Sequence, residues 1–309
     1  MSELHIITGA GPAGTTIAEQ LAAAGKQVRV LTRSGSGPDH PLVERRKVNV
    51  TVPEQLSGEF DGATAVYHCL GGSEYTAKVW QAELPPAERV VLDEAEKADT
   101  VVVFAENLYS YGKVDGPITE NLPRNADFGK PAVRTQLLRT REAHAAATVS
   151  VAAADFLGPY VRNSVAGEQL FLPILTGKRV QTFGKLDLPH SYTYMPDLAA
   201  AMIRAAADES VWNSVLHAPT APPITQRQLI DAIAAQAGVE SPKVFAAPAA
   251  MLRLLGMTSE LMRELAEMSY QVTRPFVLDS AVSEQRLGLH PTPIDQAVAA
   301  TVAWWKTQL

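Results

Sequence analysis

The sequence predicts an α/β fold, in which a doubly wound parallel sheet is followed by a smaller C-terminal lobe. Three observations carry this prediction. Short apolar strands alternate with helical stretches through the first half of the chain, an order typical of βαβ units. A glycine-rich turn, Gly9-Ala10-Gly11-Pro12-Ala13-Gly14, follows the first strand and opens a helix. From Asp155 onward the alternation gives way to Pro- and Gly-rich connections, which indicate a second lobe.

The first βαβ unit contains the glycine turn between an apolar strand at 4–7 and a helix at 15–24, with Gly25 and a second strand at 28–31 following. In this context G-x-G-x-x-G is typical of a dinucleotide site. The first glycine allows a tight turn, the second lets a pyrophosphate approach, and the third lets the helix pack on the strand. The alternative is a glycine turn without a ligand. The residues expected to contact the cofactor here are Gly9, Gly11, Pro12, Ala13 and Gly14.

The end of the second strand indicates which dinucleotide binds. NAD sites usually place Asp or Glu there to bind the ribose 2′-OH. This chain has Thr32-Arg33-Ser34-Gly35, without an acidic residue. The guanidinium of Arg33 suits a 2′-phosphate, and Ser34 adds a hydroxyl donor. We therefore expect NADP as the cofactor, the alternative being that Arg33 is a solvated arginine.

Composition excludes several classes of function. The 27 basic and 33 acidic residues give a net charge of −6, which disfavours binding to nucleic acid or to an anionic membrane. The single cysteine, Cys69, permits no intramolecular disulfide, and its apolar neighbours indicate a packed thiol. The histidine spacings match no catalytic zinc motif, so no metal is expected. Without an apolar run of bilayer length or a basic N-terminal signal, we expect a cytoplasmic protein.

Further elements follow in order. Three more strands are expected at 47–52, 63–70 and 100–104, and a sixth at 149–152. The strand at 63–70 ends in Leu70-Gly71-Gly72, so Leu70 and Gly71 are expected to lie against the cofactor. Ligands bind beyond the carboxyl ends of parallel strands. The site is therefore expected at that edge.

Helices complete the expected fold. Helical stretches are predicted around Trp80, at 87–98, at 132–147 with several arginines pointing outward, from Pro196, after the capping box Thr225-x-x-Gln228, near 249–255, at 259–270 and after Pro293. A seventh strand is predicted at 214–217. We assign 1–155 to a cofactor-binding domain that about 194–217 complete. Residues 156–193 and 218–309 are assigned mainly to a substrate-binding lobe.

These landmarks together resemble the extended short-chain dehydrogenase/reductase family, of the NAD(P)-dependent epimerase/dehydratase type. The motifs that carry the resemblance are the glycine turn, Leu70-Gly71-Gly72, Tyr111-Gly112, Glu120-Asn121-Leu122-Pro123, Asp155-Phe156-Leu157-Gly158-Pro159, Tyr194-Met195-Pro196-Asp197-Leu198-Ala199 and Leu287-Gly288-Leu289-His290-Pro291-Thr292-Pro293. The resemblance implies a Rossmann-type domain, a substrate lobe and a small-molecule substrate. Family members often dimerise through two long helices, and the helix after Pro131 is the candidate here.

The catalytic motif departs from the family pattern. Family members carry Tyr-x-x-x-Lys at the start of the long helix, with Ser or Thr four residues before the Tyr-Gly pair. The tyrosine moves the alcohol proton, and the lysine lowers its pKa and holds the ribose. The matching positions here hold Lys130, Arg134 and Asn107. The resemblance makes these three the candidate catalytic residues, and Asn107 and Lys130 also candidate cofactor contacts.

Two tyrosines beyond the fifth strand are further catalytic candidates. Tyr109-Ser110-Tyr111-Gly112-Lys113 contains a Tyr-x-x-x-Lys string. The glycine and the following Val114-Asp115-Gly116-Pro117 predict a loop rather than the single helical face that such a pair requires. Tyr109 or Tyr111 is expected either to reach the site or to pack locally.

The sugar-nucleotide signature is also altered. His190-Ser191-Tyr192-Thr193-Tyr194 stands where such members usually have an Arg-Asp pair, so the diphosphate-binding arginine is missing. His190 is then either an anion-binding residue or a loop histidine. Two hypotheses remain. The first is an NADP-dependent oxidoreductase that reduces a small-molecule carbonyl or activated double bond. The second is an inactive NADP-binding regulatory or sensor protein. A sugar-nucleotide epimerase/dehydratase with altered motifs is a further alternative.

Overall fold

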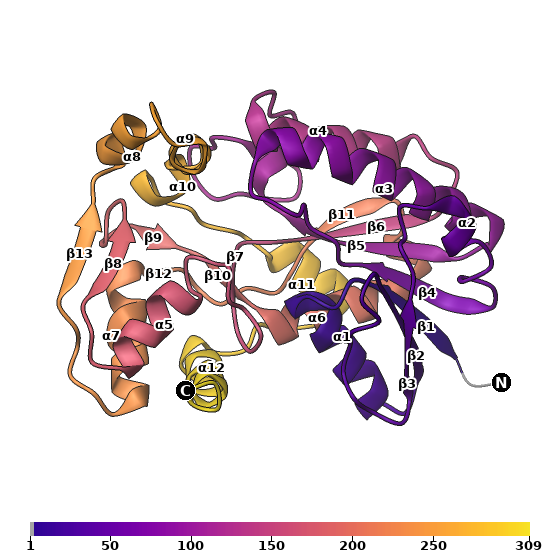
Figure 1. Cartoon of the computed structure of the whole chain (residues 1–309), viewed down its shortest axis with the longest axis horizontal. Helices are drawn as coiled ribbons and strands as arrows, with labels where there is room; N and C mark the ends of the chain where they lie inside the picture. The colour runs from indigo at the N-terminus through magenta and orange to yellow at the C-terminus, as the bar shows by residue number, and fades with distance from the viewer. Residues whose placement is uncertain (1–2) are drawn as a thin grey trace.

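The computed structural model describes residues 3–309 and is centred on a seven-stranded parallel sheet with the order β11-β6-β5-β4-β1-β2-β3 (Figure 1). The strand order reverses between β1 and β4, since the chain first builds β2 and β3 on one side and then returns. That reversal is the point at which doubly wound sheets bind ligands. The strands are β1 (Leu4–Thr8), β2 (Gln27–Thr32), β3 (Val43–Lys47), β4 (Ala63–His68), β5 (Val101–Asn107), β6 (Thr148–Ala153) and β11 (Ser214–His217).

Helices cover both faces of the sheet (Figure 1). One face carries α1 (Pro12–Ala23) and α6 (Met195–Ala206), and the other carries α2 (Pro53–Leu56), α3 (Ala77–Lys97) and α4 (Gly129–Glu142). Successive strand residues point to opposite faces. Ile7 therefore joins the buried cluster under α1 and α6, while its neighbour Ile6 joins the cluster on the opposite face. The predicted doubly wound α/β sheet is confirmed.

A second apolar cluster forms the core of the smaller lobe. It packs α5 (Glu168–Leu175), α7 (Gln226–Ala237) and α12 (Ile294–Lys306) together, with Phe171 stacked on Trp305 at 5.9 Å. Paired short strands surround it: β7 (Asp155–Leu157) with β10 (Tyr192–Tyr194), β8 (Val180–Phe183) with β13 (Val244–Ala247), and β9 (Pro189–His190) with β12 (Ile224–Thr225).

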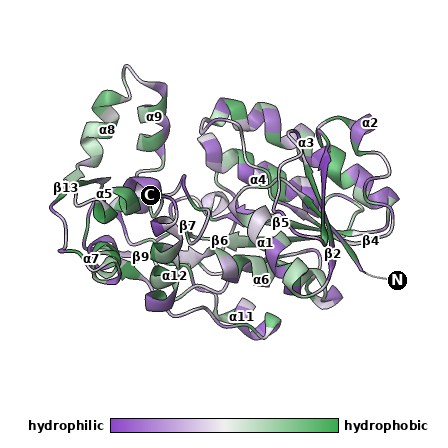
Figure 2. Ribbon diagram, turned by 60° about the horizontal axis from the view of Figure 1, so that its bottom comes forward, coloured by the Kyte–Doolittle hydropathy of each residue, from purple (hydrophilic) through white to green (hydrophobic). Residues whose placement is uncertain are grey.

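Short helices complete the chain. They are the 3-10 helices η1 (Tyr109–Tyr111) and η2 (Glu209–Val211), and α8 (Ala249–Leu255), α9 (Glu260–Glu267), α10 (Tyr270–Thr273) and α11 (Ala281–Leu287). Figures 1 and 2 show α8 and α9 as a helical pair at the end of the molecule far from the N-terminus. The predicted capping box at Thr225 and Gln228 is confirmed, and Gly238 ends that helix with a φ of 75°.

Several local predictions are wrong. The third strand lies at Val43–Lys47, not at 47–52. Charged side chains line this edge strand and form ion pairs, such as that of Glu44 with Arg29 of β2 at 2.8 Å, so the strand lacks the apolar alternation used to predict it. Val48 and Val50 are instead buried beyond its end. The two helical stretches before the fifth strand are one helix, α3, which contains Pro85 and Pro86.

The arginines of α4 were expected to point outward, but two of them are buried. Arg141 is 3% exposed and donates to both Glu88 oxygens and, at 2.9 Å, to Glu106. A buried guanidinium needs such partners, because an unpaired charge is costly in a protein interior. This network fastens α4 to α3 and β5.

Candidate cofactor site and active site

The glycine turn between β1 and α1 has three glycines with three different surroundings. Gly9 has a φ of +96°, and a Cβ there would lie 2.9 Å from the Leu70 side chain. A Cβ on Gly14 would lie 1.9 Å from the Gly9 carbonyl oxygen, so only glycine lets α1 pack this closely. A Cβ on Gly11 would meet no described atom within 4 Å. Of the three glycines, only Gly11 therefore borders open space, and this is the position at which a pyrophosphate would approach the turn.

The start of α1 provides the polar groups for that space. Thr15 N donates to Gly11 O at 2.9 Å and so begins the helix directly after the turn. Gly11 caps it without a side-chain hydrogen bond, and Pro12 fills the first helical position. The N–H groups that follow have no carbonyl partner at a helix start, which suits them to bind phosphate oxygens. The residues present therefore fit a dinucleotide pyrophosphate.

The end of β2 keeps the arrangement that the sequence predicts. Arg33 and Ser34 are both exposed in a turn where Gly35 has a φ of 74°. The Ser34 hydroxyl donates to the hydroxyl of Ser36 at 2.8 Å. In α3, hydrogen bonds from Ser73 lower the pKa of Glu83, and the charge of Arg33 lowers it further. Arg33 is thus exposed, and it lies close enough to Glu83 for its charge to act on that carboxyl.

Asn107 ends β5 and positions the first tyrosine of η1. Its Oδ1 accepts from Tyr109 N at 3.0 Å. The Tyr109 ring stacks on Trp80, with 5.9 Å between centroids and 8° between planes, and its hydroxyl shares a hydrogen bond of 2.8 Å with the Tyr75 hydroxyl. Burial raises the pKa of Tyr109 well above its ordinary value. Its hydroxyl is therefore a proton-bearing donor at neutral pH, not a base.

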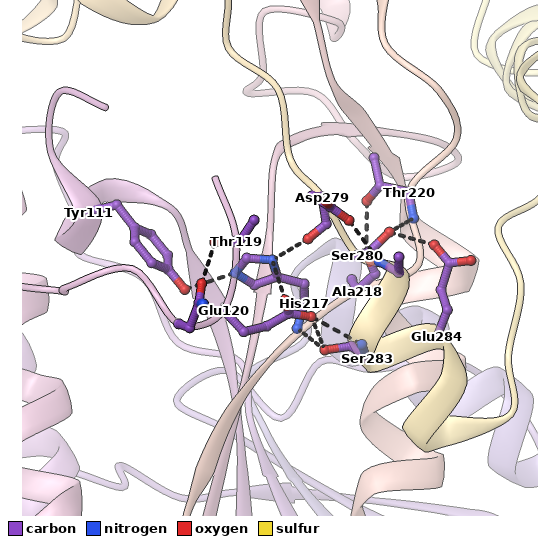
Figure 3. A network of polar contacts seen from close by, with 12 residues as sticks. Tyr111, Thr119, Glu120, His217, Ala218, Thr220, Asp279, Ser280, Ser283 and Glu284 are labelled. Atoms are coloured by element: carbon purple, nitrogen blue, oxygen red, sulfur yellow. Dashed lines mark hydrogen bonds and ion pairs between the residues drawn. The ribbon is translucent and has the colours of Figure 1, made fainter. Parts of the chain in front are cut away.

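Tyr111, two residues further on, is held in a different place. Its hydroxyl lies 2.8 Å from His217 Nε2, while His217 Nδ1 lies 2.7 Å from the Asp279 carbonyl oxygen (Figure 3). Because only Nδ1–H can donate to that carbonyl, Nε2 accepts from Tyr111. Burial lowers the pKa of His217, which keeps the ring neutral. Tyr111 thus belongs to a buried network and not to the Tyr109 cluster.

The same network continues into the C-terminal segment. His217 N donates to Ser283 Oγ at 2.8 Å, and Ser283 Oγ donates to Glu120 at 2.6 Å (Figure 3). Ser283 is fully buried. These bonds join β11, α11 and the loop after η1.

Lys130 lies at the start of α4 and is 0% exposed. Its Nζ contacts the Glu264 carboxylate, lies 3.3 Å from Glu267 Oε1 and sits 4.6 Å from the Tyr75 ring centroid. The expected neighbour, Arg134, instead pairs with other groups. The positive charge of Lys130 is therefore balanced by two carboxylates of α9, those of Glu264 and Glu267.

Arg134 faces the sheet. Its Nη1 lies 3.4 Å from Glu106 Oε1, and its guanidinium lies 4.8 Å from the Trp80 ring centroid. Its Nε is buried and makes no hydrogen bond within residues 3–309. Arg134 therefore lies near Tyr109 through the Trp80 ring, whereas Lys130 lies near it through the Tyr75 ring.

The pair formed by Asp155 and His190 was missed from the sequence. Asp155 opens β7 directly after β6, at the carboxyl edge of the sheet, and its Oδ2 lies 2.6 Å from His190 Nε2. The His190 ring lies between Tyr192 and Phe276, with centroids at 4.8 and 5.2 Å. After burial, the charge of Asp155 adds to the raised pKa of Tyr109. The charge of Asp155 thus acts on Tyr109, and the sequence signals were the place of Asp155 after a strand and that of His190 in the altered sugar-nucleotide signature.

The rest of the described chain adds neither a membrane span nor a metal cluster. Within residues 3–309, no helix combines the length and the apolar character that crossing a bilayer requires. In the same residues no three His, Cys, Asp or Glu side chains are arranged to hold a metal ion. Cys69 is a packed thiol as expected, and burial raises its pKa to about 12.

The sheet order and the glycine turn define a Rossmann-type α/β protein. The family model described as NAD dependent epimerase/dehydratase family matches residues 5–214, and the chain belongs to that family. The resemblance inferred from the motifs is thus confirmed. Among curated protein sequences, none matches this chain.

Solved structures share the fold over nearly the whole chain. The Bordetella bronchiseptica enzyme WbmH in complex with NAD+ has a TM-score of 0.77 and 20% identity, with 99% of each chain covered. The dTDP-glucose 4,6-dehydratase DesIV from Streptomyces venezuelae, with NAD bound, has 0.79 and 18%, with 98% of this chain and 97% of that chain covered. The UDP-glucose 4-epimerase from Thermotoga maritima, with UDP-glucose, has 0.77 and 16%, with 99% of each covered. At these identities the likeness shows the fold alone.

Proposed function

We propose that the protein is an NADP-dependent oxidoreductase that reduces a small-molecule carbonyl or activated double bond. The observation that carries the proposal is the glycine turn, in which Gly14 and Gly9 require glycine while Gly11 faces open space. The NAD named with two of the solved neighbours supports a nicotinamide dinucleotide. The choice of NADP rests on Arg33 and Ser34, with no acid in their place.

The cofactor would be held along the carboxyl edge of the sheet. The residues proposed to hold it are Gly9, Gly11, Pro12, Ala13, Gly14, Arg33, Ser34, Leu70, Gly71, Asn107 and Lys130. When bound, its nicotinamide would supply the hydride. The chain must then provide a proton or a hydrogen bond to the oxygen or carbon that becomes negative.

Tyr109 is the donor that the geometry supports best. Its hydroxyl keeps its proton, its backbone is fixed by Asn107, and Tyr75 shares its hydrogen bond. A proton lost from Tyr109 can be replaced through Tyr75 or from the nearby pair of Asp155 and His190. Lys130 and Arg134 are also proposed to contribute to catalysis. Lys130 can do so only after Glu264 and Glu267 have moved away from its ammonium group.

A substrate panel tests the proposal. NADPH absorbance is followed with aliphatic ketones, quinones and enones, and with UDP-glucose and dTDP-glucose as members of the sugar-nucleotide class. Consumption of NADPH with a carbonyl or enone is the expected result. Turnover of a sugar nucleotide without net NADPH consumption would contradict it and favour the epimerase/dehydratase alternative.

A second candidate is a regulatory or sensor protein that binds NADP without turning it over. The full burial of Lys130 between Glu264 and Glu267 favours this candidate. The side chain at the family's catalytic position is then engaged in ion pairs and has no surface that a substrate could contact. Tight NADPH binding without consumption across the panel would support this candidate.

A homodimer through α4 is also proposed, and light scattering after size-exclusion chromatography tests it.

A further inference from the structure

The helical pair α8–α9 lies over the start of α4 but is attached to it with little apolar burial. None of the α9 side chains is fully buried. Large apolar side chains of the pair instead face solvent: Met251, Leu254, Leu255, Met257 and Leu261 are 40%, 67%, 41%, 78% and 52% exposed. Figure 2 shows the pair at one end of the molecule, beside α3 and α4 and not packed along them. Leu252 of α8 is buried, but the contacts that α9 makes with the starts of α3 and α4 are polar.

The polar contacts are concentrated on two helix starts. Glu264 Oε1 accepts from Ala77 N, the first residue of α3, at 3.2 Å, and its other oxygen contacts Lys130 Nζ. Lys130 Nζ also donates to the Glu264 carbonyl at 3.2 Å. Glu267 Oε1 accepts from Lys130 N at 3.1 Å. Two acids of α9 thus bind both the backbone and the ammonium at the start of α4.

The backbone of α4 is shaped to receive one of these acids. Gly129 has a φ of +44°, and a Cβ there would lie 1.8 Å from Glu267 Oε2. A side chain at this position would therefore displace the carboxylate. The fit between Gly129 and Glu267 is a specific seat, not a loose surface ion pair.

Beneath this seat lies the tyrosine cluster of the candidate active site. The Tyr75 ring contacts the buried ammonium of Lys130, and the Tyr75 hydroxyl bonds to Tyr109. Tyr270, which follows α9, is 8% exposed, and its hydroxyl has no hydrogen-bond partner within the described part of the chain. An unpartnered buried hydroxyl beside this cluster is a group available to a ligand or water.

We propose that residues 249–267 form a lid, latched by Glu264 and Glu267 on Lys130, and that opening of this lid gives a substrate access to Tyr75 and Tyr109. While the latch is closed, Lys130 has no exposed surface, and Tyr75 and Tyr109 are only partly exposed. The claim that a substrate enters beneath the lid rests on the proposed function, whereas the opening of the lid itself does not depend on it. Both tests below therefore use the protein without cofactor or substrate.

Hydrogen exchange tests the latch. The latch variant combines Glu264→Gln with Glu267→Gln, and Glu260→Gln, exposed on the same helix, is the matched control. Amides of 249–267 are expected to exchange about ten-fold faster or more in the latch variant, because local opening becomes easier. Amides of β5 report whether the variant remains folded. Equal protection of the lid in the latch variant and the control would overturn the proposal.

Thiol labelling tests access. Tyr75→Cys places a thiol under the latch, and the native Cys69 stays silent because burial raises its pKa to about 12. DTNB is expected to label the new thiol slowly with the latch intact and about ten-fold faster or more once the latch variant is combined with it. Equal labelling rates in both backgrounds would show that the helical pair does not control access, whatever the cofactor proves to be.

Discussion

Asp155 and His190 lie 35 residues apart in the sequence, yet their Oδ2 and Nε2 atoms are 2.6 Å apart. The carboxylate follows β6 directly, so it lies at the edge of the sheet where doubly wound folds bind ligands. The His190 ring packs against the rings of Tyr192 and Phe276. The pair is therefore a hydrogen-bonded carboxylate and imidazole at the edge of the sheet that we propose holds the cofactor.

Asp155→Asn is expected to lower turnover by about 10²-fold while NADPH affinity stays unchanged, because general acid–base groups contribute about this much. The readout is kcat with the substrate found in the panel, together with NADPH titration. The matched control is Asp115→Asn, an exposed carboxylate that pairs with Arg274 away from this cluster. Equal kcat values for both variants would remove the pair from the mechanism.

Arg33→Ala is expected to abolish most of the preference for NADP(H) over NAD(H), because a hydrogen bond to a charged group contributes about 1.5–3 kcal/mol. Calorimetric titration with both cofactors measures the preference. Arg45→Ala, an exposed arginine on the neighbouring strand, is the control and should keep it. Equal affinities for the two cofactors in the unmodified protein would contradict the assignment of Arg33.

Gly11→Val is expected to abolish cofactor binding without lowering the thermal midpoint, because a Cβ there meets no described atom. Gly14→Val should instead destabilise the fold, since its Cβ would lie 1.9 Å from the Gly9 carbonyl oxygen. Differential scanning calorimetry and NADPH titration separate the two effects. Near-normal NADPH affinity in Gly11→Val would mean that the turn is only structural.

Lys130→Met separates the roles of that lysine. Loss of turnover with unchanged NADPH affinity would support a proton donor, and weaker NADPH binding would support a cofactor contact. Because the variant leaves Glu264 and Glu267 without their cation, we also expect faster hydrogen exchange in 249–267. Undiminished turnover would discard the catalytic role and leave Tyr109 as the donor.

Acidification is expected to destabilise the fold through His68. Burial lowers the pKa of His68 from 6.5 to about 3, while its Nδ1 bonds to Thr8 Oγ1 at 2.8 Å. Between those two pH values the unfolded chain binds the extra proton, so stability falls as pH falls, by up to about 1.4 kcal/mol per pH unit. Urea unfolding at several pH values measures the slope. His68→Gln should flatten it, and His290→Gln, which alters an exposed histidine, should not.

The features that were predicted correctly from the sequence depend on residues that are close together along the chain. The glycine turn and the capping box at Thr225 each act within a few residues, and both lie where expected. The pairing of Lys130 with Glu264 joins residues 134 positions apart, and no local pattern signals it. Edge strand β3 was misplaced because its charged residues form ion pairs instead of the apolar alternation that marks a half-buried strand.

The buried network around His217 has a consequence for dividing the protein into pieces. Ser283 and the Asp279 carbonyl, both from the C-terminal part of the chain, complete the hydrogen bonds of the last residue of β11. A fragment that stops after β11 would contain every strand of the central sheet but leave the backbone N–H and the Nδ1–H of His217 without their partners. The central sheet therefore depends on residues 279–283 for two of its buried hydrogen bonds, although all of its strands precede them in the chain.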